Sequence, residues 1–274
     1  MILTFFADPP KFAFTIPLID YPIAWYGVFF AAGFFLALRL FVFLCDYRPF
    51  SDLTGEDIGS SITNYMMLGV ILGARLFHLF FYESWLWVYE DPLRLFRFWE
   101  GGLASHGGIV CALVACAVFS KKKNLPFLAL SDRIFPCGMV LGSLIRLGNF
   151  MNQEILGVQT DLPWGVIFSS PSSMVSFGIY PRHPVQIYES FFYIFLALVG
   201  IYMLRRCAPR GRVSSVLGFL LFFGRFLVEF LKEEQSLYTQ QMSINMGQAL
   251  SIPLMAIALV ALAYTYRQPL KIQK

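Results

Sequence analysis

The sequence predicts an all-α membrane protein, a polytopic helix bundle of seven transmembrane spans with a periplasmic head and an interfacial arm. Hydrophobic residues make up 57% of the 274 residues and charged residues 14%. Soluble domains are about 25% charged, so this chain lacks the polar side chains that would cover a water-facing surface. Several apolar stretches reach the roughly 20 residues that a spanning helix needs. We therefore expect a single integral-membrane domain over residues 1–274.

The expected spans lie at residues 22–45, 58–81, 104–120, 133–152, 184–204, 213–231 and 246–266. The third and sixth are short, and the fourth contains arginines. Glycines one helical turn apart, Gly69 with Gly73 and Gly138 with Gly142, predict close helix packing in the second and fourth spans. The first 20 residues lack a basic start followed by a short apolar run and a small-residue cleavage site, so no removable signal peptide is expected.

Two segments between the spans are expected to carry structure of their own. Residues 153–183 are rich in Pro, Ser, Gly and Asp, and a structureless loop of this length is uncommon. They predict a folded head over the outer face. Residues 82–103 are dense in aromatic side chains (Trp85, Trp87, Tyr89, Phe96, Phe98 and Trp99). Such rings settle at the headgroup layer, which predicts an arm lying on the membrane surface.

Basic residues predict the orientation of the chain. One set of loops holds eleven of them: Arg48, Lys121, Lys122, Lys123, Arg205, Arg206, Arg210, Arg212, Arg267, Lys271 and Lys274. The alternate segments hold five: Lys11, Arg94, Arg97, Arg182 and Lys232. The positive-inside rule then puts the amino terminus in the periplasm and the carboxyl terminus in the cytoplasm. Contact with anionic lipid accounts for the net charge of +4, and no nucleic-acid partner is expected.

Motifs of soluble enzymes are absent from the sequence. It contains no His-Glu-x-x-His, no phosphate-binding Gly-x-x-x-x-Gly-Lys, no Gly-x-Ser-x-Gly and no Gly-x-Gly-x-x-Gly. The five cysteines lie in or beside apolar segments without a Cys-x-x-Cys pair, where cysteine behaves as a small hydrophobe. We expect neither a metal site nor an organic cofactor. The candidates that remain are polar residues near the outer ends of the spans.

His106 stands among four glycines, in Gly101-Gly102-Leu103-Ala104-Ser105-His106-Gly107-Gly108. Glycine lets a backbone approach a ligand closely, and imidazole titrates near neutral pH. His106 is therefore a candidate base, or a donor to an anionic headgroup. It could equally be an interfacial histidine that satisfies a helix end, and the spacing leaves both interpretations open.

Arg146, Asn149, Asn152 and Glu154 end the fourth apolar stretch. A charge at the centre of a bilayer costs about 2.5–3.5 kcal/mol on insertion scales and commonly marks a functional cavity. The planar guanidinium matches phosphate oxygens in a bidentate way. The alternative is a structural pair of Arg146 with Glu154, eight residues apart on one helical face. The two asparagines favour a polar cavity.

Arg225 and Glu229 lie one turn apart in the sixth span. They could form a self-neutralising pair, or Arg225 could join Arg146 around a phosphate, and the sequence alone does not decide. Tyr26 could donate a hydrogen bond, although tyrosines of the interfacial belt are more common. His78 fits a packed histidine and His183 an interfacial one.

Taken together, these motifs resemble the phosphatidylglycerol–prolipoprotein diacylglyceryl transferases of bacterial inner membranes. The resemblance runs from Trp25 to Pro253, over nearly the whole chain. It rests on Trp25-Tyr26-Gly27, Asp91-Pro92-Leu93, Ser105-His106-Gly107-Gly108, Arg146-Leu147-Gly148-Asn149-Phe150, Asn152, Glu154, Gly157, Pro181-Arg182-His183-Pro184, Arg225 with Glu229, and Asn245-Met246-Gly247-Gln248 with the residues up to Pro253. One departure is Ile145, where the family usually has glycine.

The resemblance implies transfer of the diacylglyceryl group from phosphatidylglycerol to the lipobox cysteine thiol in the signal peptide of a prolipoprotein. A thioether forms and glycerol phosphate leaves. The implied catalytic residues are His106 as base, Arg146 and Arg225 as stabilisers of the departing phosphate, and Tyr26. The implied substrate-binding residues are Arg146, Asn149, Asn152, Glu154, Gly157 and Glu229. Membrane lipids are the other expected partners.

Two other functions fit parts of the pattern. A transporter or channel for an anionic solute would also place arginines inside the membrane. Such proteins often show inverted repeats, and we find none in the sequence. A different lipid-headgroup enzyme, such as a phosphatidyl transferase, commonly needs metal-binding acidic clusters, which the spans here lack. The diacylglyceryl transferase interpretation is therefore favoured over both alternatives.

Overall fold

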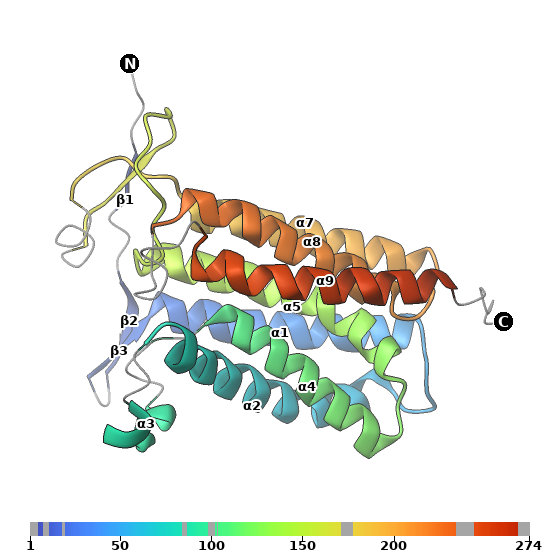
Figure 1. The fold of residues 1–274 in the computed structure, drawn as a ribbon. Coiled ribbons are helices and arrows are strands. Elements are labelled where there is room, and N and C mark those ends of the chain that lie inside the picture. Colours follow the sequence, from blue (N-terminus) through green and yellow to red (C-terminus); the bar gives the residue numbers. More distant parts are fainter. Residues whose placement is uncertain are drawn as a thin grey trace.

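Seven long helices run side by side in the computed structural model, which describes residues 5–7, 11–17, 20–83, 87–97, 102, 104–170, 178–233 and 244–267 (Figure 1). They are α1 (Trp25–Tyr47), α2 (Gly55–Phe81), α4 (Ser105–Lys123), α5 (Phe127–Met151), α7 (Val185–Arg205), α8 (Arg212–Val228) and α9 (Met246–Arg267). A short 3-10 helix, η3 (Glu229–Leu231), continues α8. The predicted all-α membrane bundle is confirmed.

Six of these described helices are long and apolar enough to cross a membrane, so the chain is a multi-pass membrane protein. The exception is α4, which covers the predicted third span. Its 19 residues include the polar start Ser105-His106-Gly107-Gly108 and end in Lys121, Lys122 and Lys123. The helix nevertheless packs lengthwise against α2 (Figure 1).

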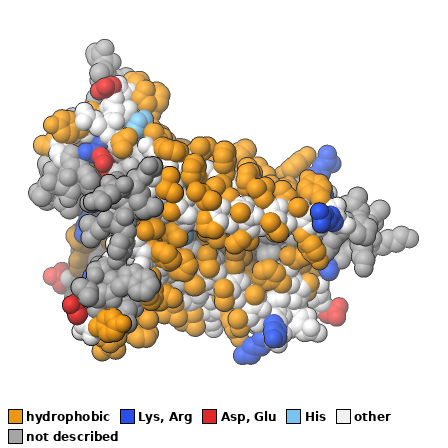
Figure 2. Space-filling model, in the orientation of Figure 1, with side chains coloured by type: hydrophobic (Ala, Val, Ile, Leu, Met, Phe, Trp, Pro, Cys, Tyr) orange, Lys and Arg blue, Asp and Glu red, His pale blue; other side chains and the backbone are white. Residues whose placement is uncertain are grey.

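The surface of the bundle is apolar and its interior holds the polar groups. Phe35, Phe191, Leu198 and Val260 are all more than half exposed, and hydrophobic side chains cover the face of the bundle seen in Figure 2. Buried charged residues are rare in soluble proteins, yet Arg75 and several others are buried here. This distribution fits a chain whose outer surface contacts lipid.

Glycines let α2 and α4 approach each other closely. A Cβ atom on Gly73 would lie 2.3 Å from the Cβ of Cys111, and one on Gly107 would lie 2.3 Å from the carbonyl oxygen of Gly73. The close packing predicted for Gly69 and Gly73 is therefore confirmed. On α5 the prediction holds for Gly142, where a Cβ would lie 3.1 Å from the ring of Tyr193 on α7. It is wrong for Gly138, because nothing lies within 4 Å of a Cβ built there.

The start of α5 differs from the prediction. We expected the fourth span to begin at residue 133, whereas the helix begins at Phe127. Its first two turns hold Asp132 and Arg133, both buried. Asp132 accepts hydrogen bonds from the backbone of Gly211 and Ser214 at the start of α8, and Arg133 donates to the carbonyl of Leu44 near the end of α1. Charged side chains here cap neighbouring helices, whose terminal backbone groups lack intrahelical partners.

Four short strands, absent from the sequence-based prediction, lie at one end of the bundle (Figure 1). β1 (Phe5–Ala7) pairs in parallel with β4 (Val166–Phe168), and β2 (Phe12–Ile16) pairs antiparallel with β3 (Tyr21–Ala24). β4 belongs to the predicted head segment 153–183, of which residues 171–177 lie outside the described part. That this segment forms a periplasmic head stays a prediction.

The predicted interfacial segment 82–103 contains two short helices, α3 (Trp87–Glu90) and η1 (Pro92–Phe96). Glu83 forms an ion pair with Arg94 at 2.8 Å and contacts His78 on α2 at 3.1 Å. These contacts join the segment to the bundle. Trp85, Phe98, Trp99, Gly101 and Leu103 lie outside the described residues. The membrane-surface position of the arm stays a prediction.

Candidate functional site

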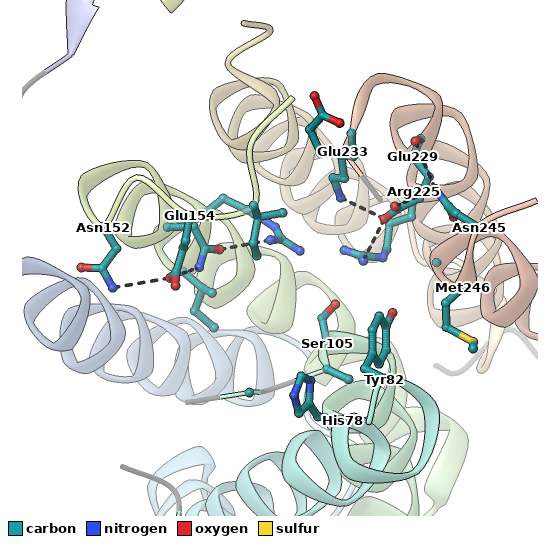
Figure 3. A pocket seen from close by; sticks show the side chains of 18 of the residues that line it. His78, Tyr82, Ser105, Asn152, Glu154, Arg225, Glu229, Glu233, Asn245 and Met246 are labelled. Carbon is teal, nitrogen blue, oxygen red and sulfur yellow. Dashed lines mark hydrogen bonds and ion pairs between the residues drawn. The ribbon is translucent and has the colours of Figure 1, made fainter. Parts of the chain in front are cut away.

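A polar cavity of about 470 Å³ opens at the end of the bundle that carries the strands. Its wall takes residues from α1, α2, α4, α5, α8, η3 and α9 and from the segment after α5 (Figure 3). Among the predicted site residues, those in the wall are Tyr26, Arg146, Asn149, Asn152, Glu154, Arg225 and Glu229. Helices far apart in the sequence therefore bring most of the predicted site together.

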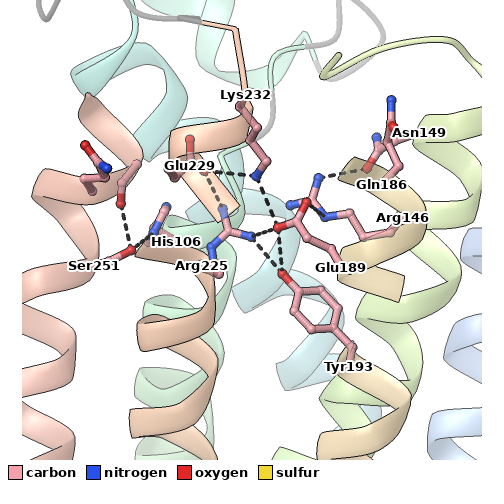
Figure 4. A network of polar contacts seen from close by, with 12 residues as sticks. His106, Arg146, Asn149, Gln186, Glu189, Tyr193, Arg225, Glu229, Lys232 and Ser251 are labelled. Carbon is pink, nitrogen blue, oxygen red and sulfur yellow. Dashed lines mark hydrogen bonds and ion pairs between the residues drawn. The ribbon is translucent and has the colours of Figure 1, made fainter. Parts of the chain in front are cut away.

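Arg146 and Arg225 face this cavity around one carboxylate, Glu189 of α7 (Figure 4). Nε of Arg146 lies 3.1 Å from one oxygen of Glu189, and Nη1 of Arg225 lies 3.2 Å from the other. Both arginines are 5% exposed and Glu189 is 1% exposed. Two guanidinium groups repel each other in a medium of low dielectric constant, and a shared carboxylate offsets that repulsion.

Lys232 and Tyr193 complete the cluster around Glu189. Nζ of Lys232 lies 3.2 Å from Glu189 and 3.0 Å from Glu229. The hydroxyl of Tyr193 donates to Glu189 at 3.2 Å and accepts from Nη1 of Arg225 at 2.9 Å. Burial lowers the pKa of Lys232 below the usual lysine value, and Glu189 and Glu229 oppose that shift. Three cations thus surround two carboxylates.

Arg146 and Glu154 do not form the direct pair that the sequence allowed. Nη1 of Arg146 donates to Oδ1 of Asn149 at 3.1 Å, and Nδ2 of Asn149 donates to Glu154 at 2.7 Å. The helix ends at Met151, and Gln153 then adopts a positive φ of 53°, so the chain turns back before Glu154. Asn149 therefore links Arg146 to the carboxylate of Glu154, and all three residues line the cavity.

Arg225 and Glu229 are joined only at 3.7 Å, longer than the contacts of Arg225 with Glu189 and Tyr193. Glu229 is held instead by Lys232 and by Nδ2 of Asn245 at 3.3 Å. Gly247 is needed for this arrangement, because a Cβ there would lie 2.4 Å from the Glu229 carboxyl carbon. The self-neutralising pair, one of the two arrangements that the sequence left open, is thus a minor contact within a larger cluster.

His106 lies behind the cavity wall, in which its neighbour Ser105 takes part. The imidazole is 1% exposed, and Nε2 lies 3.1 Å from the hydroxyl of Ser251. That hydroxyl donates to the carbonyl of Gly247 at 2.7 Å. Because the hydroxyl proton of Ser251 is engaged by Gly247, the hydroxyl oxygen is placed to accept a proton from Nε2. In the tautomer protonated at Nε2, Nδ1 carries the lone pair.

Gly157 is not among the residues that line either of the two described cavities, and its contact with the substrate stays a prediction. Its carbonyl accepts a hydrogen bond from Arg182 at 3.0 Å. A Cβ at this position would lie 2.3 Å from the carbonyl oxygen of His183 and 3.0 Å from that of Leu231. Gly157 also forms an isolated β-bridge with Lys232. Gly157 thus lets two backbone segments cross closely beside Lys232, which belongs to the cluster around Glu189.

A second cavity, of about 210 Å³, adjoins the polar one. The two share Tyr26, Ser105, Ile145, Arg146 and Arg225. The rest of its wall is mainly apolar and includes Gly138, whose missing side chain leaves open space. An anion-binding site beside a hydrocarbon-lined site suits an amphiphile with an anionic head and an apolar tail.

Four residues near the predicted site were not predicted as site residues: Glu189, Tyr193, Lys232 and Ser251. Glu189 carried a usable signal, because a carboxylate inside the stretch 184–204 is as costly as Arg146 is in its own span. Lys232 stands three residues after Glu229. Tyr193 and Ser251 differ in no visible way from other polar residues of the spans. Among the described residues, no three His, Cys, Asp or Glu side chains are grouped so that they could hold a metal ion.

Comparison with known proteins identifies relatives along nearly the whole chain. The family model described as prolipoprotein diacylglyceryl transferase matches residues 11–264. A phosphatidylglycerol–prolipoprotein diacylglyceryl transferase of Chlamydia muridarum is 35% identical over 273 residues, covering 93% of this chain and 96% of the relative. Proteins of the same name from Chloroherpeton thalassium and Cupriavidus metallidurans are 37% and 38% identical, each over 90% of this chain and 89% and 90% of the relative.

Proposed function

The chain belongs to the prolipoprotein diacylglyceryl transferase family, and we propose that its polar cavity is the site where the diacylglyceryl group of phosphatidylglycerol passes to the lipobox cysteine of a prolipoprotein. The observation that carries this proposal is the pair Arg146 and Arg225, held around Glu189 at the junction of a polar and an apolar cavity. Such a junction accommodates both parts of one lipid.

The lipid phosphate binds between the two guanidinium groups, which favour bidentate contact with phosphate oxygens. Nε of Arg225 is buried without a hydrogen-bond partner among the described residues, so it can donate to a ligand. The rim residues Asn149, Asn152, Glu154 and Glu229 offer acceptors and donors to the glycerol hydroxyls. The acyl chains occupy the apolar cavity and the lipid phase beside it.

The reaction begins with the thiolate of the lipobox cysteine, since the thiol has a pKa of about 8.5 and is a poor nucleophile while protonated. The sulfur attacks the glycerol carbon that bears the phosphate ester. The carbon–oxygen bond breaks, its electron pair stays on the phosphate oxygen, and a thioether and glycerol phosphate result. Arg146 and Arg225 stabilise the growing negative charge in a site that is shielded from water.

We propose that Nδ1 of His106 accepts the proton of the thiol. This nitrogen is unprotonated when Nε2 donates to Ser251. Because the imidazole lies behind Ser105, the thiol has to approach along that edge of the cavity. Tyr26, which lines both cavities, donates its hydroxyl proton to the substrate in a hydrogen bond. A hydrogen-bond donor beside a phosphate adds to the electrostatic stabilisation.

We place the protein in the bacterial inner membrane with the amino terminus and the cavity on the periplasmic side. The described ends of α1, α4, α7 and α9 and the start of α8 carry basic residues, and they lie opposite the strands (Figures 1 and 2). The positive-inside rule assigns that basic end to the cytoplasm. Secreted prolipoproteins would then meet the cavity as they emerge.

Replacing Arg146 tests the site directly. Purified wild-type protein, reconstituted with labelled phosphatidylglycerol and a lipobox peptide, should add a diacylglyceryl mass to the peptide cysteine. Arg146→Ala should lower the rate by about 10²–10³-fold, the cost of removing one oxyanion donor. Arg39→Ala, which removes an exposed arginine paired with Glu56 at 3.8 Å, is the matched control and should remain active.

Full activity of folded Arg146→Ala would overturn the role of the arginine. A wild-type protein that leaves the peptide unmodified would overturn the transferase assignment. If that protein instead moved an anionic solute across the vesicle membrane, the transporter interpretation would replace it. A serine in place of the peptide cysteine should abolish labelling, which identifies the thiol as the acceptor.

A further inference from the structure

The proposed reaction moves negative charge from the thiolate sulfur onto the phosphate. The phosphate of the lipid is a diester with one negative charge. The departing glycerol phosphate is a monoester, whose second ionisation has a pKa of about 6. It therefore carries nearly two charges at neutral pH. A buried site that binds the diester well must supply further positive charge as the ester bond breaks.

The two arginines are already fixed by other groups. Arg146 is held by Glu189 and Asn149, and Arg225 by Glu189 and Tyr193. Together with Lys232, they give three positive charges around the two carboxylates Glu189 and Glu229. Glu154, which Asn149 joins to Arg146, is a further carboxylate in the cavity wall.

Lys232 differs from the arginines in how it is held. Its ammonium lies between Glu189 and Glu229 and borders the polar cavity (Figure 4). Only two of its three N–H groups have partners in the part of the chain that the structure describes. A lysine ammonium is a compact charge on a flexible stem, so it can turn toward a new oxygen without losing its charge.

The backbone keeps Lys232 at the cavity edge. It follows η3 directly, where the N–H of Val158 donates to the carbonyl of Leu231 at 2.9 Å. Gly157 bridges to Lys232 at the same crossing, and the lack of a side chain there permits the approach. The lysine is thus positioned by the segment after α5, the segment that also carries Glu154.

We propose that Lys232 binds the departing glycerol phosphate, by donating an N–H of its ammonium group to a phosphate oxygen as the second negative charge develops. The ammonium keeps its proton, and no further reactant is needed. The inference rests on the proposed transferase function and adds a catalytic residue to it. The charged groups that face Lys232 are Arg146 on α5, Glu189 on α7, Arg225 on α8 and Glu229 on η3.

The experiment compares the full-length variants Lys232→Met and Lys232→Arg with wild type. Lys123→Met is the matched control, because Lys123 is exposed at the far end of α4. Initial rates are measured against phosphatidylglycerol concentration, and sn-glycerol phosphate serves as the product probe. Lys232→Met should lower kcat by about 10²-fold, as for loss of an oxyanion donor, while the KM for phosphatidylglycerol stays nearly unchanged. Lys232→Arg should restore most of the rate.

Product binding separates a chemical role from a structural one. Lys232→Met should weaken the binding of glycerol phosphate by at least about tenfold, or about 1.4 kcal/mol. Wild-type binding should tighten as the pH rises through about 6, where the probe gains its second charge. Lys232→Met should lose that tightening.

Three results would overturn the inference. The first is that Lys232→Met weakens the binding of lipid and of glycerol phosphate equally, and the second is that it behaves like wild type. The third is that Lys232→Arg folds but does not restore the rate. Calorimetric binding of glycerol phosphate needs no turnover. It therefore tests Lys232 even if wild-type protein transfers nothing, a result that would count against the proposed function itself.

Discussion

At the scale of single residues, Glu189 organises the site. Its two oxygens contact side chains from α5, α7, α8 and the residue after η3. The sequence rule that a charge in a span marks function identified Arg146 and Arg225 and applies equally to Glu189. What the sequence could not reveal is that one carboxylate serves three cations, because their positions span residues 146 to 232.

Replacing Glu189 should reveal this dependence. Glu189→Gln keeps the shape of the side chain and removes its charge, which leaves three buried cations with only Glu229 beside them. We expect a loss of about 3–5 kcal/mol in the free energy of unfolding, as for breaking a buried ion pair, together with loss of transfer. Denaturant titration in detergent measures the stability.

The control for this change is Glu56→Gln. Glu56 pairs with Arg39 at 3.8 Å, and its side chain is 71% exposed. Surface pairs contribute about 0–1 kcal/mol, so stability should hardly change. Equal stability of the two variants would mean that Glu189 does not hold the cations together.

At the scale of elements, helix positions could be predicted from apolar runs, whereas several ends could not. The predicted fourth span excluded Asp132 and began only at Arg133, because charges are costly in a membrane. The structure satisfies both side chains with backbone groups of α8 and α1, contacts between segments that a local pattern cannot contain. Strands β1 and β4 were not predicted for a similar reason, since they are three residues each and pair across about 160 positions.

Asp132→Ala tests the capping of α8 by α5. The change removes acceptors for the N–H groups of Gly211 and Ser214 and for the Ser214 hydroxyl. Buried donors left without partners cost about 1–3 kcal/mol, so thermal unfolding should begin at a lower temperature. Asp52→Ala, an exposed position in the neighbouring loop, should behave like wild type. An unchanged melting temperature for Asp132→Ala would contradict the capping role.

At the scale of the whole molecule, composition alone predicted a membrane bundle, and charge placement predicted which end holds the polar site. Most of the site residues that the motif resemblance implied line the polar cavity. The apolar cavity beneath the arginines was not predicted, since it depends on which helix faces meet. Gly138 was expected to pack against a neighbouring helix, and it opens onto this cavity instead.

Filling the apolar cavity should alter lipid use. Gly138→Leu places a side chain in open space, so folding should be preserved, and leucine is the better helix former by about 0.8 kcal/mol. We expect transfer from long-chain phosphatidylglycerol to fall more than transfer from a short-chain analogue, measured as the ratio of the two kcat/KM values. An unchanged ratio would mean that acyl chains bind elsewhere. Val260→Leu, at an exposed position on the outer surface of α9, is the control and should leave the ratio as in wild type.

The contact between Gly73 and Gly107 has one more effect. It fixes the height at which α4 sits against α2, and His106 is the residue directly before Gly107 on the same turn. A methyl group on either glycine would wedge the two backbones apart and carry the imidazole away from Ser251. Gly73 and Gly107 line neither cavity. Because each carries only a hydrogen atom in place of a side chain, they nevertheless determine the orientation of the His106 imidazole.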